Sequence, residues 1–258
     1  MHPALLLLAD SRLPAGGHAH SGGTEAAIAS GRVTGLPSLD AFLRGRLHTT
    51  GRVSAALAAA ACTLARQPDI SASWRDQQAA SDISASWGDQ QAASDISASW
   101  GDLQAASDIS ASWRGLQAEA DARTASPALR RASCQQGKLL LRVAARLWTG
   151  LDALAAAVPE PHHPLALGAA AHAAGAAPGD AALAAAYHSV TGPATAAVRL
   201  LGLDPVEVHR LLAGLTGDLA RIAGQAHGPP ESLPACSAPA LDLLAEQHAE
   251  ADLRLFVS

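Results

Sequence analysis

The sequence predicts an all-α fold, a single globular helical bundle over residues 1–258 that contains a low-complexity tandem-repeat insert. Hydrophobic residues make up 49% of the chain but aromatic residues only 3%. The apolar content is therefore mostly Ala, Leu and Val, which suits closely packed helices better than a β-sandwich. No stretch alternates polar and apolar residues between turn signals, so we expect no substantial sheet.

Two helices are expected in the first quarter of the chain. Ser38 is placed to cap a helix through LDAFLRGRLHTT (39–50), because a serine hydroxyl can accept an unpaired N–H of the first turn. Residues 53–66 are rich in Ala and Leu and predict a second helix.

A third helix is predicted in the middle of the chain, where Ser126 precedes Pro127. This pair places a capping residue before a proline at the first helical position. The helix should reach Trp148. Gly137 interrupts it at a cost of about 1 kcal/mol relative to Ala, which indicates a close helix–helix contact. Four apolar residues should lie on or near one face, namely Leu129, Leu140, Val143 and Leu147.

Two helices are predicted next, at 165–174 and from Asp180 onward. The first should end at Gly175, because glycine adopts the left-handed conformation of a helix end without strain. The second should break at Gly192-Pro193, because proline lacks the N–H that a helix interior needs.

The last third of the chain predicts two more helices. Asp204-Pro205-Val206-Glu207 reads as a capping box that opens a long helix to about Gln225. A Pro-rich loop at 228–239 should precede a final helix at 241–250, and the chain ends in the tail LRLFVS.

Four near-identical copies of 13 residues occupy residues 69–120. Trp74, Trp87, Trp100 and Trp113 mark the same position in each copy. Thirteen residues are too few for a solenoid unit, and on one helix they turn through roughly 1300°, so successive Trp side chains would diverge. The Ser-, Asp- and Gln-rich composition buries little. We expect an extended insert or weakly helical loop that arose by duplication; a Trp-bearing binding array is the alternative.

Charge and cysteine usage exclude several classes of protein. The net charge of −5 and the pI of about 6.1 leave no basic footprint for nucleic acid. The apolar run at 3–9 is far shorter than the ~20 residues of a membrane span and lacks the charged start of a secretory signal. Three scattered cysteines without a CxxC pair indicate neither disulfides nor a zinc–thiolate site. We therefore expect a cytoplasmic protein that binds neither nucleic acid nor membrane.

Catalytic motifs are absent from the sequence, which contains no GxGxxG, GxSxG or HExxH. The chain is therefore expected to be no enzyme and to carry no cofactor. His18 and His20 in a Gly-rich loop are weak metal candidates, and His162-His163 is expected on a surface loop. Neither pair has a third ligand at a recognised spacing. Solvated or hydrogen-bonded histidines are the ordinary alternative, and a transient nickel contact stays open.

The segment LPAGGHAHSGGTE (13–25) is the most informative part of the sequence. Its glycines permit positive φ and close backbone approach. Ser21 is placed to cap a helix that begins near Glu25, whose carboxylate suits a first turn. The segment is either a tight loop packed beneath helices or a docking loop that presents polar groups on a fixed backbone.

Four segments resemble the urease accessory proteins of the UreF type, in particular actinobacterial-type members. In chain order they are LLLLADSRLPAGGHAHSGGTE (5–25), SPALRRASCQQGKLLLR (126–142), YHSVTGPATAAVRLLGLDP (187–205) and RLFVS (254–258). The resemblance implies an all-α, non-enzymatic protein that forms a homodimer in its complex. It also implies binding to a UreD/UreH-type accessory protein and a platform for the UreG-type GTPase, which together deliver nickel to apo-urease.

The resemblance further implies partner-binding residues. Arg254, Leu255, Phe256 and Ser258 look like the tail that docks on the UreD/UreH-type partner, with Leu255 and Phe256 as apolar anchors. The alternative is that Phe256 packs into its own core.

Two further regions match partner-facing parts of the family. Tyr187 and Arg199 lie in a segment that resembles the part of the family involved in the dimer and GTPase-facing surfaces. For Arg199, an ordinary surface ion pair is an equally good alternative. The N-terminal motif is assigned to the partner-facing region through Gly16, Gly17, His20, Ser21 and Glu25.

The chain departs from the family pattern in two places. Thr24 stands where members usually have an aliphatic residue, so local packing is expected to be weaker. The repeat occupies a short, variable connection, and it either disturbs the neighbouring helices or leaves them untouched. Two other functions compete with the resemblance: a stand-alone nickel-binding or metal-transfer protein that uses the histidine pairs, and a helical enzyme with an unrecognised site, which no visible carboxylate cluster supports.

Overall fold

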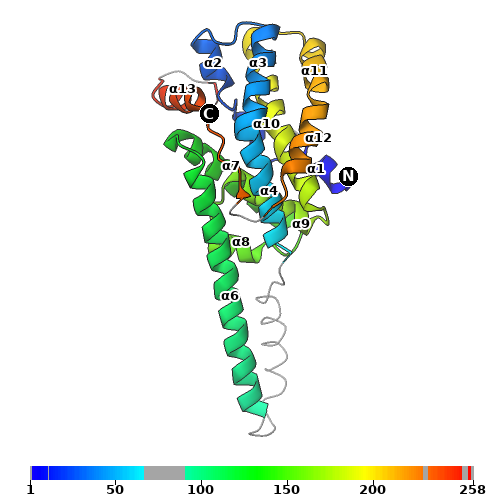
Figure 1. Ribbon diagram of the computed structural model, residues 1–258, viewed down its shortest axis with the longest axis vertical. Coiled ribbons are helices and arrows are strands. Elements are labelled where there is room, and N and C mark those ends of the chain that lie inside the picture. The colour runs from blue at the N-terminus through cyan, green and yellow to red at the C-terminus, as the bar shows by residue number, and fades with distance from the viewer. Residues whose placement is uncertain (1, 11, 67–90, 229–231, 252–254, 257–258) are drawn as a thin grey trace.

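The part of the chain that the structure describes is built from helices. The computed structural model describes residues 2–10, 12–66, 91–228, 232–251 and 255–256; for residues 18 and 91–106 it describes the backbone only. These ranges contain helices and no strand, which confirms the predicted all-α fold. Figure 1 shows the helices gathered into one body, from which the first turns of α6 (Gln91–Ala122) project.

One long helical rod runs through the first quarter of the chain. Helix α3 (Leu36–Arg46), a π-helical turn η2 (Leu47–Gly51) and α4 (Arg52–Leu64) follow one another without a break. The two helices predicted here are therefore continuous. Ser38 is the third residue of α3 rather than its cap, and its hydroxyl accepts the N–H groups of Thr34 at 2.9 Å and Gly35 at 3.2 Å.

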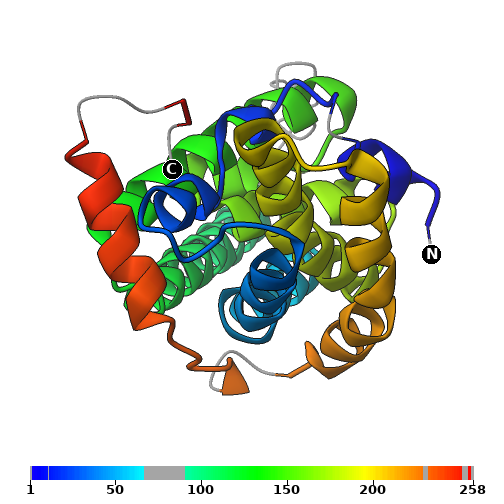
Figure 2. The same ribbon diagram turned by 90° about the horizontal axis from the view of Figure 1, so that it is seen from above.

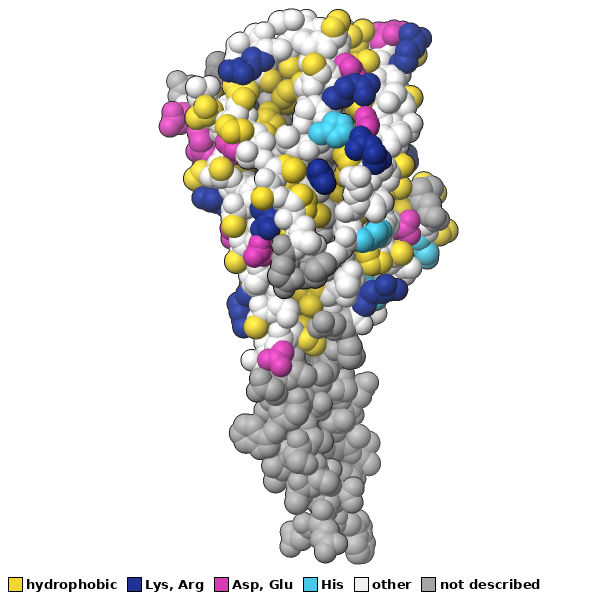
Figure 3. Space-filling model, viewed as in Figure 1, with side chains coloured by type: hydrophobic (Ala, Val, Ile, Leu, Met, Phe, Trp, Pro, Cys, Tyr) yellow, Lys and Arg dark blue, Asp and Glu magenta, His cyan; other side chains and the backbone are white. Residues whose placement is uncertain are grey.

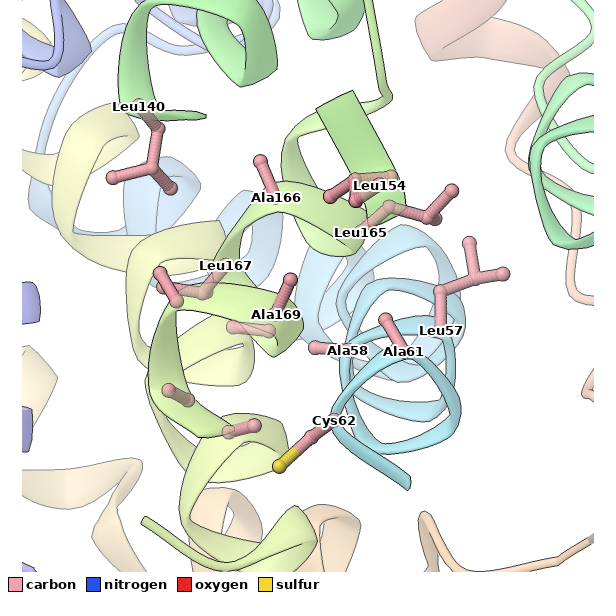
Figure 4. Packing of buried hydrophobic residues seen from close by; sticks show 14 of the residues in the cluster. Leu57, Ala58, Ala61, Cys62, Leu140, Leu154, Leu165, Ala166, Leu167 and Ala169 are labelled. Carbon is pink, nitrogen blue, oxygen red and sulfur yellow. The ribbon is translucent and has the colours of Figure 1, made fainter. Parts of the chain in front are cut away.

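Helix α4 packs against α9 (His163–Ala173) in the middle of the body, as Figure 4 shows. Residues 164–171 of α9 are all buried, as in a helix surrounded by protein. A Cβ on Gly168 would overlap the carbonyl oxygen of Ala58 and lie 2.7 Å from the Cβ of Ala61. Small residues therefore set this close approach, as the Ala-rich composition predicts. The chain leaves α9 through Gly175 at φ +84°, also as predicted.

Helix α7 (Pro127–Leu147) begins as the sequence predicts, because the Ser126 hydroxyl accepts the N–H of Leu129 at 3.1 Å. Its buried face differs from the predicted one. Leu140 is buried, whereas the Leu147 side chain is 53% exposed. The buried residues of the helix are Ala132, Gly137, Leu140, Leu141 and Ala144.

Gly137 makes the close contact that its position indicates, but with the chain entering α9 rather than with the side of a helix. A Cβ there would overlap the carbonyl oxygen of Pro161. His162 is consequently 2% exposed, and its Nε2 lies 3.0 Å from the carboxylate of Asp121. The prediction that His162-His163 lies on a surface loop is therefore wrong.

Helix α10 (Pro178–Leu201) continues through Gly192-Pro193, where a break was predicted. Proline cannot donate the hydrogen bond that the carbonyl of Ser189, four residues earlier, would receive in a helix. The Nε of Arg46 donates to this carbonyl at 2.8 Å instead. Thr24 is fully buried, and its hydroxyl donates to the carbonyl of Pro193 at 3.3 Å. Two neighbouring side chains therefore bind the backbone around the proline, and the helix persists.

The predicted helix from Asp204 to Gln225 is two helices, α11 (Pro205–Gly214) and α12 (Thr216–Gln225). Asp204 caps the first by accepting the N–H of Val206 at 2.9 Å. The buried Leu215 separates them, and its N–H bonds to Leu212 in a tighter turn.

The predicted last helix is α13 (Pro239–Ala249), which packs on α2 (Thr24–Ala29) and α7. Figure 2 shows α13 at the edge of the body beside α2. The remaining short helices are α1 (Ala4–Leu8), η1 (Gly17–Ala19) and α8 (Asp152–Ala157). None of the described helices is long and apolar enough to cross a membrane.

The repeat enters the described structure in α6 (Gln91–Ala122). Residues 67–90, with Trp74 and Trp87, lie outside the described residues, and so does the side chain of Trp100. The expectation that the repeat is a loop that buries little is wrong for its fourth copy. Trp113 is only 2% exposed and belongs to the main hydrophobic cluster together with residues of α4, α7 and α9.

The fourth copy differs from the others by a complete apolar face. Trp113, Leu116 and Ala120 are buried and Ile109 is partly buried, at steps of four, three and four residues that follow one side of a helix. In the first two copies, Gln and Ser stand at the positions of Leu116 and Ala120. The last copy is therefore an integral part of the helical core.

Candidate functional site

A cavity of about 440 Å³ lies between the N-terminal segment, α10 and the end of the chain. All of its lining residues except Arg46 and His163 belong to the four segments 5–25, 126–142, 187–205 and 254–258. These segments are far apart in the sequence and carry the resemblance described above. The fold brings them to one place, which makes this cavity the candidate functional site.

The N-terminal segment enters the cavity on a fixed backbone. Gly16 and Gly22 have φ of +76° and +60°, and a Cβ on Gly22 would lie 3.0 Å from Pro193 of α10. Gly17 and His20 line the cavity. Ser21 is fully buried, and its hydroxyl accepts the N–H of Glu25 at 3.3 Å. The capping residue of α2 is Gly23 rather than Ser21, which lies two residues before it.

Glu25 holds the C-terminal tail against the N-terminal segment. Its carboxylate accepts the N–H of Leu255 at 2.8 Å and the N–H of Phe256 at 3.0 Å. His248 of α13 lies on the other side, with its Nε2 3.4 Å from the carboxylate and 3.3 Å from the carbonyl oxygen of Phe256. The side chains of Glu25 and His248 are only 13% and 7% exposed, so the contact is largely shielded from solvent.

The two predicted apolar anchors of the tail have opposite environments. Phe256 is 8% exposed and lines the cavity, so the alternative in which it packs against its own chain describes this structure. Leu255 is 80% exposed. Arg254 and Ser258 lie outside the described residues. Leu255 is therefore the described tail residue that is free to contact a partner.

Arg46 joins three elements at the cavity wall. Its Nη1 donates to the carbonyl of Gly22 at 2.7 Å, while its Nε bonds to Ser189 as described above. Burial lowers the pKa of Arg46 to about 10, so the guanidinium stays charged at neutral pH. Sequence reasoning missed this residue, because its partners are backbone carbonyls that become available only when α10 continues through Pro193.

The histidines near the cavity do not pair as the sequence suggests. His163 lies beside His188, with ring centroids 5.6 Å apart, whereas its sequence neighbour His162 contacts Asp121. Burial lowers the pKa of His163 to about 3, with the charges of His188 and His20 adding to the effect, and burial lowers the pKa of His188 to about 4. Both rings are therefore neutral at pH 7. His188 adjoins Tyr187 in the third segment, a position that sequence reasoning passed over.

The predicted metal candidates do not meet in a described ligand cluster. His20 lines the cavity, but the side chain of His18 lies outside the described residues. Among the side chains that the structure describes, no group of three His, Cys, Asp or Glu could hold a metal ion.

Helix α10 carries the two remaining predicted residues. Arg199 is exposed and lines the cavity, whereas Tyr187 is 40% exposed and lies outside the cavity wall. The structure therefore separates these two residues into a cavity position and a surface position. Figure 3 shows positive and negative side chains interspersed over one face of the body, with no large area of a single sign.

Comparisons with known proteins identify the family. The family model for UreF matches residues 33–216. A relative from Mycobacterium sp. (strain JLS), named urease accessory protein UreF, is 40% identical over 258 residues, which cover 98% of this chain and 97% of the relative. Relatives of the same name from Mycobacterium marinum and Mycolicibacterium vanbaalenii are 40% and 39% identical over the same shares of both chains. The name describes an accessory protein, in agreement with the prediction that the chain is not itself an enzyme. The chain belongs to the UreF family.

Proposed function

We propose that the chain is a non-enzymatic urease maturation subunit of the cytoplasm. In this role it binds a UreD/UreH-type accessory protein and recruits the UreG-type GTPase, so that nickel is inserted into apo-urease. The observation that carries the proposal is the convergence of four separated segments on one cavity, with the tail fixed beside the N-terminal motif. The names of the curated relatives support the same role.

The tail contact with the UreD/UreH-type partner is assigned mainly to Leu255. An 80% exposed leucine gains free energy when a partner covers it, whereas Phe256 is already buried. Arg254 and Ser258 are proposed to add polar contacts on either side. Glu25, together with Gly16, Gly17, His20 and Ser21, is proposed to shape the surface on which the tail is presented.

The dimer contact is assigned to α10. Tyr187 is the most exposed aromatic residue among the described side chains, and tyrosine is enriched at the centres of interfaces. Arg199 is proposed to face the GTPase. We further propose that the chain is one domain, because α4 and α10 contribute buried residues to both hydrophobic clusters.

A pull-down with the UreD/UreH-type partner tests the tail assignment. Leu255→Asp should abolish capture while the helical circular dichroism of the free chain stays unchanged. Leu147→Asp is the matched control, because this leucine is also exposed, at the end of α7. Capture of the Leu255→Asp chain at the wild-type level would rule out this tail contact.

Activation of apo-urease tests the role itself. Urease co-expressed with its other accessory proteins and nickel should stay inactive when this chain is left out. Full activation without the chain would contradict the proposal. The stand-alone nickel-binding alternative rested on histidine pairs, and since His162 and His163 contact different residues, we do not propose it.

A further inference from the structure

The charged groups around the cavity are unbalanced. Among the residues that the structure describes, three arginines line it, whereas Asp10 is the single lining carboxylate. Asp10 is already bound by Arg12, whose Nε and Nη2 lie 3.1 Å and 3.0 Å from its two carboxylate oxygens. Within the described ranges, neither Arg46 nor Arg199 forms an ion pair with a carboxylate. The cavity wall therefore carries two positive charges, those of Arg46 and Arg199, for which the described residues supply no carboxylate partner.

Arg46 has one nitrogen that the fold does not use. Its Nε and Nη1 are occupied by the carbonyls of Ser189 and Gly22, and its Nη2 forms no hydrogen bond within the described part of the chain. Every fully buried side-chain nitrogen or oxygen in that part has a partner, so Nη2 must reach open space. Arg46 lines this cavity and a second, neighbouring one, and these are the open spaces beside it within the described part of the chain.

The two bonds to Ser189 and Gly22 do not explain the charge of Arg46. Carbonyl oxygens need only N–H donors, and a buried cation without a counter-ion is costly. A guanidinium held rigidly at two of its nitrogens offers its remaining N–H groups in a fixed plane, which is the geometry that carboxylate and phosphate oxygens accept.

The other side chains of the cavity suit an anion. His163 is neutral, and a neutral imidazole still supplies one N–H donor, whereas the ring of neutral His188 already forms a hydrogen bond to the backbone of Leu8. Arg199, an exposed residue of α10, lines the same cavity, whereas the hydroxyls of Thr191 and Thr195 already donate to carbonyls of their own helix. A volume of about 440 Å³ is in the range of pockets that bind small molecules.

We infer that this cavity binds a small oxoanion, as a free ion or as the head group of a small molecule, between Arg46 and Arg199. The assignment is independent of the docking of the tail and of the UreD/UreH-type partner. It gives the positive charge of Arg46 the counter-ion that the described part of the chain does not supply.

Titration of the purified full chain tests the site. The histidine ring resonances are followed by NMR at pH 7.5 while sodium phosphate is added, against sodium chloride at equal ionic strength; acetate serves as a carboxylate probe. His163 and His188 should shift saturably with phosphate, acetate or both, and not with chloride. Saturation by phosphate alone indicates a phosphate site, and saturation by acetate alone a carboxylate site. The absence of any saturable shift would overturn the inference.

Substitutions locate the ligand. Arg199→Gln should raise the apparent Kd about tenfold or more, the factor expected when one charged hydrogen bond is lost. Arg142→Gln is the matched control, an exposed arginine on α7 outside the cavity, and should leave the Kd unchanged. Arg46→Lys keeps the charge but loses the planar group, and should also weaken binding where the variant folds. Equal weakening by Arg199→Gln and Arg142→Gln would show general surface attraction and overturn the inference.

Discussion

Replacement of Trp113 by alanine tests the conclusion that the fourth repeat copy belongs to the core. Trp113 is 2% exposed. A buried tryptophan removes about 200 Å² from water, which at about 25 cal/mol per Å² corresponds to about 5 kcal/mol. The compactness of the unfolded chain reduces this figure, so we expect a loss of about 3–4 kcal/mol, within the range measured for buried aromatic residues replaced by alanine.

Urea denaturation followed by circular dichroism at 222 nm measures the effect of Trp113→Ala. Trp87→Ala is the matched control, because it removes the same residue from the same repeat in a copy whose aligned positions are Gln90 and Ser94. We expect the control to lose less than about 1 kcal/mol. Equal losses in the two variants, or a loss below about 1 kcal/mol for Trp113→Ala, would refute the reasoning.

Three further predictions follow from the cited contacts. Gly137→Ala should destabilise the chain by several kcal/mol, because the added Cβ overlaps the backbone at Pro161. Gly115→Ala in α6, whose added Cβ meets nothing within 4 Å, should be neutral or stabilise the chain by up to about 1 kcal/mol. Urea midpoints measure the stability of both variants, and equal effects would contradict the assigned contact. Glu25→Gln should speed hydrogen exchange of the Leu255 and Phe256 amides by about tenfold, because these amides donate to the Glu25 carboxylate. Mass spectrometry measures the exchange, and the surface substitution Glu160→Gln should leave it unchanged. Exchange at the wild-type rate in Glu25→Gln would disprove the tail contact. His163 and His188 have folded pKa values near 3 and 4, below the ordinary 6.5, so the unfolded chain binds more protons than the folded chain between about pH 6.5 and pH 4. Stability should therefore be complete above pH 6.5 and fall below it by on the order of 1 kcal/mol per pH unit for each ring. Urea midpoints at pH 7.5 and 5.0 should differ less in His163→Gln/His188→Gln than in the control His227→Gln, and identical differences would contradict the assignment.

Local signals predicted most helix starts and ends correctly. The Ser126-Pro127 start, the Asp204 cap and the exit at Gly175 depend on residues within one turn of each other, so the sequence contains all the information needed. Close packing of Ala-rich helices was also predictable from composition, because no large side chains separate them.

The environments of individual side chains were less predictable, because they depend on elements distant in the sequence. His162 was expected at the surface from its prolines, but Gly137, 25 residues earlier, admits its backbone into the interior. Phe256 was assigned to a partner, and Glu25, at the other end of the chain, turns it inward. The apolar face of the fourth repeat is visible in the sequence, but a comparison of the Trp positions alone does not show it. Leu116 separates this copy from the first two, and Ala120 separates it from all three.

Arg46 shows why the fold and the candidate site could not be predicted separately. A proline inside α10 leaves the carbonyl of Ser189 without its helical N–H donor, and the Arg46 side chain of α3 donates to this carbonyl instead. The arginine that forms this hydrogen bond also carries a positive charge. It lies at the wall of a cavity whose one acidic side chain among the described residues is bound to Arg12. The same contact that keeps α10 continuous therefore makes the cavity electropositive. A substitution at Pro193 that restores the N–H would remove the structural reason for Arg46 but leave its charge and its planar group. Pro193→Ala should therefore retain oxoanion binding, whereas Arg46→Lys, which loses the planar group, should weaken it.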